Sequence, residues 1–206
     1  MKELLIAEES LAQSEILSSK FIALAEPLEE VEDLESLLAS LQTRYPKASH
    51  YCYAAKILSF EACSDDGEPS RSAGVPLLDL LKKKEIAYGA IVVVRYFGGT
   101  KLGAGRLARY YRETAAQSLN QAIFAEILPG IEVELELDYP TFEGLKKRAE
   151  KEGLELKVLS FDERVRLLLR GDAKIIPSWL SLLPQGAIQK RREIKLQRRI
   201  AHDSKQ

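Results

Sequence analysis

The chain carries two kinds of hydrophobic pattern around its centre. Residues 90–94 read AIVVV, an uninterrupted apolar run rich in β-branched side chains. That length and composition are typical of a buried strand. Beyond it, Leu107, Tyr111 and Ala115 recur every four residues, which predicts an amphipathic helix running to about Phe124. The centre of the chain therefore predicts a buried strand, a glycine-rich loop and a helix.

Shorter patterns precede this stretch. Strands are expected at 11–17, 21–25, 51–57 and 60–63, and helices between Pro27 and Pro46 and from Ser72 to Lys84. Strands and helices are thus mixed along the first half, which indicates an α+β fold.

Residues 131–206 carry a pattern that is complete in itself. Ile131, Val133, Leu135 and Leu137 alternate with acidic residues, as in a half-buried strand. A helix, two strands, a short helix and a last strand follow, giving the order βαββαβ that is typical of a ferredoxin-like unit. Because Pro129-Gly130 precedes this pattern, we predict two domains, 1–129 and 130–206.

Composition limits the classes of protein to consider. The 206 residues have a formal net charge of −1, so any attraction to nucleic acid must come from a local basic surface. No apolar run is long enough to span a membrane. Two cysteines, Cys52 and Cys63, make neither a disulfide framework nor a zinc site, and they favour free thiols in a cytoplasmic protein.

The loop and helix at 95–112 concentrate glycines and cations in a half of the chain that is otherwise acidic. The glycines are Gly98, Gly99, Gly103 and Gly105, and the cations are Arg95, Lys101, Arg106, Arg109 and Arg112. A glycine loop admits a ligand to the backbone, and a helix N-terminus offers free N–H groups, so this pattern predicts an anion site, with phosphate as the anion. The spacing matches neither the mononucleotide nor the dinucleotide loop. The alternative is a tightly packed turn with solvated arginines.

A second group of candidate residues combines acids with a histidine. His50, Asp65, Asp66 and Glu68 have the chemistry for acid–base work or for holding a divalent cation. Cys52 or Ser70 beside His50 would be a nucleophile pair. The spacing matches no named catalytic signature, and the alternative is that the acids cap turns and pair with Arg95 or Arg71. The sequence favours a protein that is not an enzyme and that holds no metal or cofactor.

A basic run near the C-terminus also has two interpretations. Its members are Lys190, Arg191, Arg192, Lys195, Arg198 and Arg199. They resemble a nucleic-acid patch. In a ferredoxin-like sheet, however, Arg191, Lys195 and Arg199 would flank the acidic row of the first strand, with Arg164, Arg166 and Arg170 on its other side. That row is Glu132, Glu134, Glu136 and Asp138. Cross-strand pairs of opposite charge stabilise a sheet, so we favour this structural role, which does not cover Lys190, Arg192 and Arg198.

Four motifs occur in a specific order through the first half of the chain. They are SKFIALAEP at 19–27, ASHYCYAAKI at 48–57, SDDGEPSRSAG at 64–74 and VVVRYFGGTKLGAGRLARYY at 92–111. In these motifs the chain resembles the IMPACT family, in its two-domain bacterial, YigZ-type form. The resemblance implies a first domain like domain IV of elongation factor G, with a ribosomal-protein-type β-α-β fold, and a second like its domain V. It also implies translation control, where the family's eukaryotic members bind a protein partner.

We therefore predict a cytoplasmic, non-enzymatic protein that binds RNA or the ribosome through residues 95–112 and regulates translation. The alternatives are a small hydrolase centred on His50 and the acidic loop, and a protein-interaction module with a partner in translation control. No membrane partner is expected.

Overall fold

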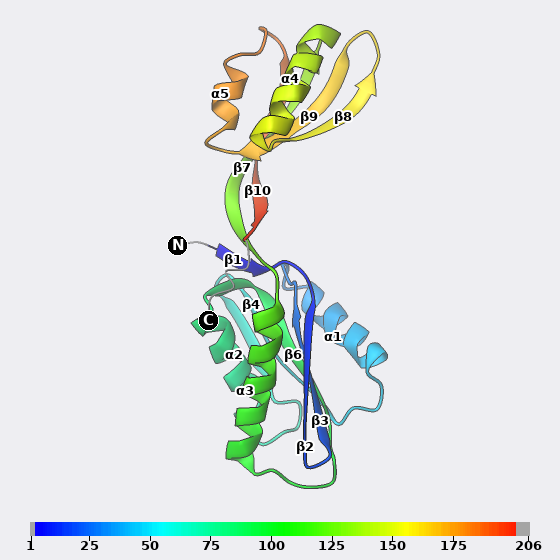
Figure 1. Cartoon of the computed structure of the whole chain (residues 1–206), viewed down its shortest axis with the longest axis vertical. Helices are drawn as coiled ribbons and strands as arrows, with labels where there is room; N and C mark the ends of the chain where they lie inside the picture. The colour runs from blue at the N-terminus through cyan, green and yellow to red at the C-terminus, as the bar shows by residue number, and fades with distance from the viewer. Residues whose placement is uncertain (1–2, 201–206) are drawn as a thin grey trace. The chain divides into compact units, whose positions relative to one another are not determined.

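The computed structural model describes residues 3–200, which form a mixed α+β protein (Figure 1). The described residues divide into two compact units. The first contains residues 3–126 and 199–200, and the second contains residues 127–198.

The first unit is a sheet with helices on both faces. Its elements are β1 (Glu3–Ile6), β2 (Ser10–Ile16), β3 (Ser19–Glu26), α1 (Asp33–Arg44), β4 (His50–Ile57), β5 (Phe60–Ser64), α2 (Gly74–Lys83), β6 (Ile86–Tyr96) and α3 (Ala104–Gln121). Five strands lie in the antiparallel order β2-β3-β6-β4-β5, and β1 runs parallel to the start of β6.

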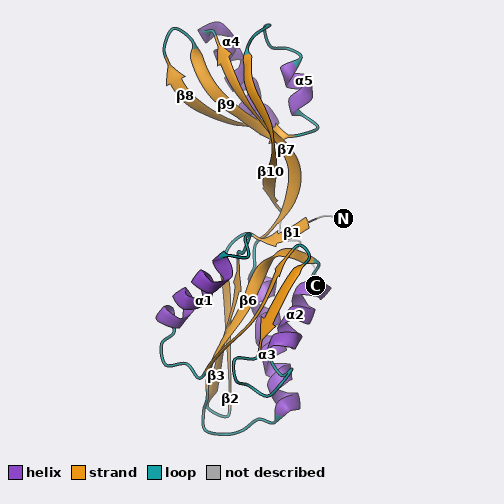
Figure 2. Cartoon of the chain, turned by 180° about the vertical axis from the view of Figure 1, so that it is seen from behind, coloured by secondary structure: helices purple, strands orange, loops and turns teal. Residues whose placement is uncertain are grey.

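The centre of this unit is β6, which is buried on both faces as its apolar run predicts. Ile91 and Val93 pack in the core that includes residues of α2 and α3. Val92 and Val94 point to the opposite face, where Leu41 of α1 covers them. Figure 2 shows α1 on one side of the sheet and α2 with α3 on the other. This two-sided burial fixes the end of β6, from which the glycine-rich loop starts.

Two helix ends differ from the sequence prediction. The first helix begins at Asp33, because a turn occupies the residues after Pro27 and leaves Val31 exposed. The long helix α3 ends at Gln121, where Ala122 takes an extended backbone conformation and β7 begins two residues later.

The second unit has the element order β-α-β-β-α-β. Its elements are β7 (Phe124–Leu137), α4 (Tyr139–Glu152), β8 (Glu155–Phe161), β9 (Val165–Asp172), α5 (Ile176–Leu180) and β10 (Ile188–Arg199). The strands lie in the order β10-β7-β9-β8, as expected for the ferredoxin-like pattern. Val133, Leu135, Leu167 and Leu169 point to the side covered by α4 and α5 and form the core with Trp179.

The sequence predicted a domain boundary at Pro129-Gly130, but this dipeptide lies inside a strand. Strand β7 runs through it, and the compact units divide between Glu126 and Ile127. Strand β9 pairs with β7 only from Gly130 onward, so Pro129 removes no N–H from that ladder. A side chain at Gly130 would come within 2.4 Å of Leu196, so this glycine allows close packing.

Candidate nucleic-acid interface

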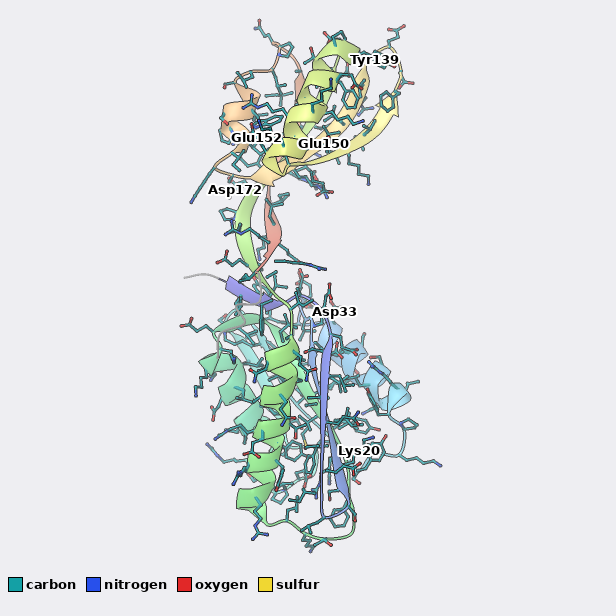
Figure 3. All side chains as sticks on the ribbon, viewed as in Figure 1. Lys20, Asp33, Tyr139, Glu150, Glu152 and Asp172 are labelled. Carbon is teal, nitrogen blue, oxygen red and sulfur yellow. The ribbon has the colours of Figure 1, made fainter. Side chains whose placement is uncertain are left out.

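The glycine-rich loop, residues 97–103, connects the end of β6 to the start of α3. In Figure 1 it lies at the same end of the first unit as the turn between β2 and β3. Lys20, labelled in Figure 3, marks that end of β3, since it pairs with Tyr96, the last residue of β6.

The first half of the loop is fixed by two serines. The Phe97 N–H donates to Ser49 Oγ at 3.0 Å, and the Gly98 N–H donates to Ser19 Oγ at 3.0 Å. A Cβ at Gly98 would lie 2.1 Å from the carbonyl carbon of Ser18, closer than any side chain tolerates. The packed-turn interpretation therefore holds for Gly98.

The other three glycines are in open surroundings. An added Cβ at Gly99, Gly103 or Gly105 would meet nothing within 4 Å. Gly99 and Gly103 have φ of +88° and +78°, which favours glycine on conformational grounds. Gly105 lies in the first turn of α3, where glycine is less favourable than alanine by up to about 1 kcal/mol. The second half of the loop thus leaves its backbone accessible.

Four exposed cations lie on this loop and on the helix that follows it. Lys101, Arg106, Arg109 and Arg112 are all exposed, while Leu107 and Tyr111 on the same helix face the core. The helix begins at Ala104, and the preceding Gly103 provides no side-chain cap, nor is there an acid in the first turn. Arg109 pairs with Glu113 at 2.7 Å, but both side chains are largely exposed, so the pair is weak. The exposed charge of this segment is positive.

The placement of Arg95 corrects its predicted role as an exposed anion-binding residue. Its side chain is only 4% exposed, and Nη1 donates to Glu68 Oε1 at 2.5 Å. Nη2 lies 3.3 Å from Ser19 Oγ, and the guanidinium is stacked near the rings of Phe21 and Phe97. Strand β6 is buried on both faces, so a cation at its end faces the interior. Arg95 is therefore excluded from the candidate interface.

The acidic loop has a structural role at Asp65 and Asp66. Asp65 accepts hydrogen bonds from the N–H groups of Arg71, Ala73 and Gly74 at 2.7 to 2.9 Å, ahead of α2. Burial raises the pKa of Asp65, but these hydrogen bonds outweigh burial and hold it below its usual value. Asp66 accepts from the Tyr51 N–H at 2.6 Å. Asp65 stabilises the turn ahead of α2, as the structural alternative predicted, and Asp66 ties the acidic loop to β4.

Glu68 is the centre of a mostly buried polar cluster. Besides Arg95, it accepts a hydrogen bond from the Tyr111 hydroxyl at 2.8 Å, and its other oxygen lies 3.8 Å from His50 Nε2. His50 Nδ1 donates to the carbonyl oxygen of Asp66 at 2.7 Å. The sequence predicted that His50, Asp66 and Glu68 belong to one cluster, and they do lie close together. Their hydrogen bonds and ion pairs are made with other groups of this chain.

The cysteine of this cluster is a poor nucleophile. The Cys52 thiol is buried, lying 3.0 Å from the Asp65 carbonyl oxygen and 3.3 Å from the Tyr111 hydroxyl. Burial raises the pKa of the Cys52 thiol and also that of Tyr111. Residues 3–200 contain no group of three or more His, Cys, Asp or Glu side chains placed to hold a metal ion.

A charge ladder on the sheet of the second unit includes Arg192 of the C-terminal basic run together with three arginines at or next to β9. Its ion pairs are Arg170–Glu132 at 2.5 Å, Arg166–Glu134 at 2.5 Å, Arg164–Glu136 at 3.6 Å and Arg192–Glu132 at 2.6 Å. Arg164, Arg166 and Arg170 pair with the acidic row of β7 from the β9 side, as expected. On β10 the partner of Glu132 is Arg192, where the sequence had favoured Arg191, and Arg199 pairs with Glu8. Asp138 caps α4 by accepting from the Thr141 N–H at 2.8 Å.

Sequence reasoning missed the residues that shape the loop. Ser19 and Ser49 are far from it in sequence, and only the pairing of β3 and β4 with β6 brings them there. Phe97 is next to the first glycine of the loop, and it could have been singled out as an aromatic residue beside a glycine pair. None of the described helices has both the length and the apolar content needed to cross a membrane.

Comparison with known proteins now identifies the class of protein that carries this loop. A family model described as the Impact N-terminal domain matches residues 17–119, which include β3, β6, the glycine loop and most of α3. The chain belongs to the IMPACT family.

Individual relatives extend the match beyond that domain. An IMPACT family member of Haemophilus influenzae is 32% identical over 195 residues, covering 90% of this chain and 93% of the relative. YigZ of Escherichia coli is 31% identical over 164 residues, covering 76% and 78% of the two chains. A crystal structure described only as that of a hypothetical protein aligns with a TM-score of 0.62 and 27% identity, covering 91% of this chain and 95% of that one.

Proposed function

We propose that this protein binds RNA, on its own or within the ribosome, as a non-enzymatic regulator associated with translation. The observation that carries the proposal is that the loop and helix with the open glycines Gly99, Gly103 and Gly105 also carry four exposed cations. These are Lys101, Arg106, Arg109 and Arg112. Phosphate groups are recognised by such cations together with accessible backbone N–H groups.

The two units supply a second line of support. We propose that they correspond to domains IV and V of elongation factor G, as the resemblance of the sequence implies. The strand order β10-β7-β9-β8 of the second unit agrees with a ferredoxin-like domain of this kind. This proposed correspondence with a translation factor supports RNA as the ligand, although fold alone does not define function.

The charge ladder of the second unit is the weaker candidate surface. Its arginines Arg164, Arg166, Arg170 and Arg192 each have an acidic partner on β7. A phosphate would have to displace that partner, so the net attraction is smaller there. The proposal therefore assigns RNA contact to the first unit.

Co-sedimentation with ribosomes at low salt tests the proposal. The triple variant Lys101→Ala, Arg106→Ala and Arg112→Ala is expected to lose most of the binding. A matched control is Lys146→Ala, Lys147→Ala and Lys151→Ala on α4, which removes the same charge from exposed positions. Equal pelleting of both variants would contradict the proposed surface.

A further inference from the structure

Phe97 is an exposed aromatic ring at the start of the glycine-rich loop. With 46% of its surface exposed, it is the most exposed aromatic side chain among the described residues of the first unit. Exposing an aromatic ring to water is unfavourable, and the core of this unit holds Phe21 and Tyr111 in full burial. Within the chain the ring lies against the Arg95 guanidinium, and this contact leaves nearly half of its surface open to water.

The backbone at Phe97 is fixed, and its ring lies against one neighbouring side chain. The backbone on either side is fixed by the bonds from Phe97 to Ser49 Oγ and from Gly98 to Ser19 Oγ. The Arg95 guanidinium carbon lies 5.3 Å from the centroid of the Phe97 ring. Arg95 is itself fixed by Glu68 at 2.5 Å. Phe97 is therefore preorganised, supported by a guanidinium whose charge is already neutralised.

The surroundings of the ring indicate what kind of group it meets. Gly99 follows two residues later with open space around it, and exposed Lys101 and Arg106 lie on the same loop and the helix that follows. A purely apolar partner would form no ion pair with these cations, and a phosphate alone would form no stacking contact with the ring. An unpaired nucleotide satisfies both, because its base stacks on an aromatic ring and its phosphate binds cations.

We propose that Phe97 is a stacking platform for an unpaired base of single-stranded RNA. This inference rests on the proposed function and adds the form of RNA that the site selects. The phosphates beside the stacked base contact Lys101 and Arg106. Duplex RNA has its bases stacked and paired, so it offers no base to Phe97 and binds through charge alone.

The test measures the affinity of a fluorescent single-stranded 12-mer RNA, and of the same sequence as a duplex, by anisotropy over a range of salt concentrations. Phe97→Leu is expected to weaken single-strand binding about tenfold or more and to leave duplex binding unchanged. The salt dependence should not change, because no charge is removed. Phe97→Tyr should retain the affinity.

The matched control is Phe161→Leu, the same substitution at an exposed phenylalanine of the second unit. It should bind as the unmodified protein does, and thermal unfolding should show that both leucine variants fold. If Phe97→Leu binds the single strand as tightly as Phe161→Leu, the stacking platform is overturned, while a salt-dependent affinity that falls in the Lys101, Arg106 and Arg112 variant would leave the proposed function standing. Absence of any RNA binding by the unmodified protein would overturn both.

Discussion

Arg95 and Glu68 illustrate the cost of placing charge inside a small core. Both side chains are 4% exposed, and the pair lies at the end of a strand that is buried on both faces. Removing one partner of a buried pair leaves the other without compensation, which costs more than the pair itself contributes. The Tyr111 hydroxyl shares the same carboxylate oxygen and links the pair to α3.

We therefore expect Glu68→Gln to lower the free energy of unfolding by about 3 kcal/mol or more. The matched control is Glu113→Gln, which breaks the exposed pair with Arg109 and should cost less than about 1 kcal/mol. Urea unfolding of both variants measures the difference. Equal, small losses would mean that the Arg95–Glu68 pair is not buried as described.

The carboxyl group of Glu26 makes the stability of the protein depend on pH. Its side chain is buried, and burial together with the nearby Glu9 carboxylate raises the pKa of Glu26 to about 7. The native state then holds a proton that the unfolded chain, with its ordinary pKa near 4.5, releases. Stability due to this group is present at low pH and is lost as the pH rises toward and through 7.

Glu26→Gln mimics the protonated form and should therefore stabilise the protein at pH 8 by up to about 3 kcal/mol and have little effect at pH 5. Urea unfolding of the variant and the unmodified protein at these two pH values measures the effect. A stabilisation of the same size at both would show that the Glu26 carboxyl titrates normally.

The glycine-rich loop combines two different uses of glycine within one element. Gly98 is crowded by the backbone of Ser18, whereas Gly105 has open space and lies in the first turn of α3. Alanine at Gly98 should destabilise the protein, because the backbone atoms it meets belong to the β2–β3 turn. Alanine at Gly105 should stabilise it by up to about 1 kcal/mol.

If the open backbone at Gly105 serves RNA binding, the stabilising Gly105→Ala change should also weaken RNA affinity. Thermal unfolding and RNA titration of the same samples separate the two effects. Gly105→Ala that binds RNA as well as the unmodified protein would show that the first turn of α3 does not approach the ligand.

At the level of elements, β6 and α3 could be predicted because their buried faces require apolar residues at regular spacing. The AIVVV run and the spacing of Leu107, Tyr111 and Ala115 reflect which faces are covered. The sequence offered the pairing of Arg95 with an acid only as an alternative, since the residue types do not show which cation lies opposite which acid. The contacts of Ser19 and Ser49 with the loop could not be predicted, because they depend on strand pairing between distant parts of the chain.

On the scale of the whole molecule, the second unit has its own core and a complete sheet. Residues 127–198 include the core residues Val133, Leu135, Leu167 and Trp179 and the paired charges on the other face of the sheet. We expect residues 127–198, produced alone, to unfold cooperatively with urea and to give a β-rich circular dichroism spectrum. A fragment without a cooperative transition would show that this core needs the rest of the chain.

The same fragment should bind RNA weakly, because its arginines already have acidic partners. That expectation depends on the charge ladder and is independent of the loop. An affinity for RNA equal to that of the whole chain would assign the contact to β10 and would contradict the interface at 95–112.

The central claim is that phosphate groups meet the loop and the start of α3, and the salt dependence of RNA affinity tests it most directly. Each phosphate contact on a single strand contributes a slope of about −0.7 in the logarithm of the binding constant against that of salt. The triple variant Lys101→Ala, Arg106→Ala and Arg112→Ala should bind weakly, with a slope flatter by up to about two units. The control Lys146→Ala, Lys147→Ala and Lys151→Ala should keep both affinity and slope. A triple variant at residues 101, 106 and 112 that keeps the full slope would contradict the account.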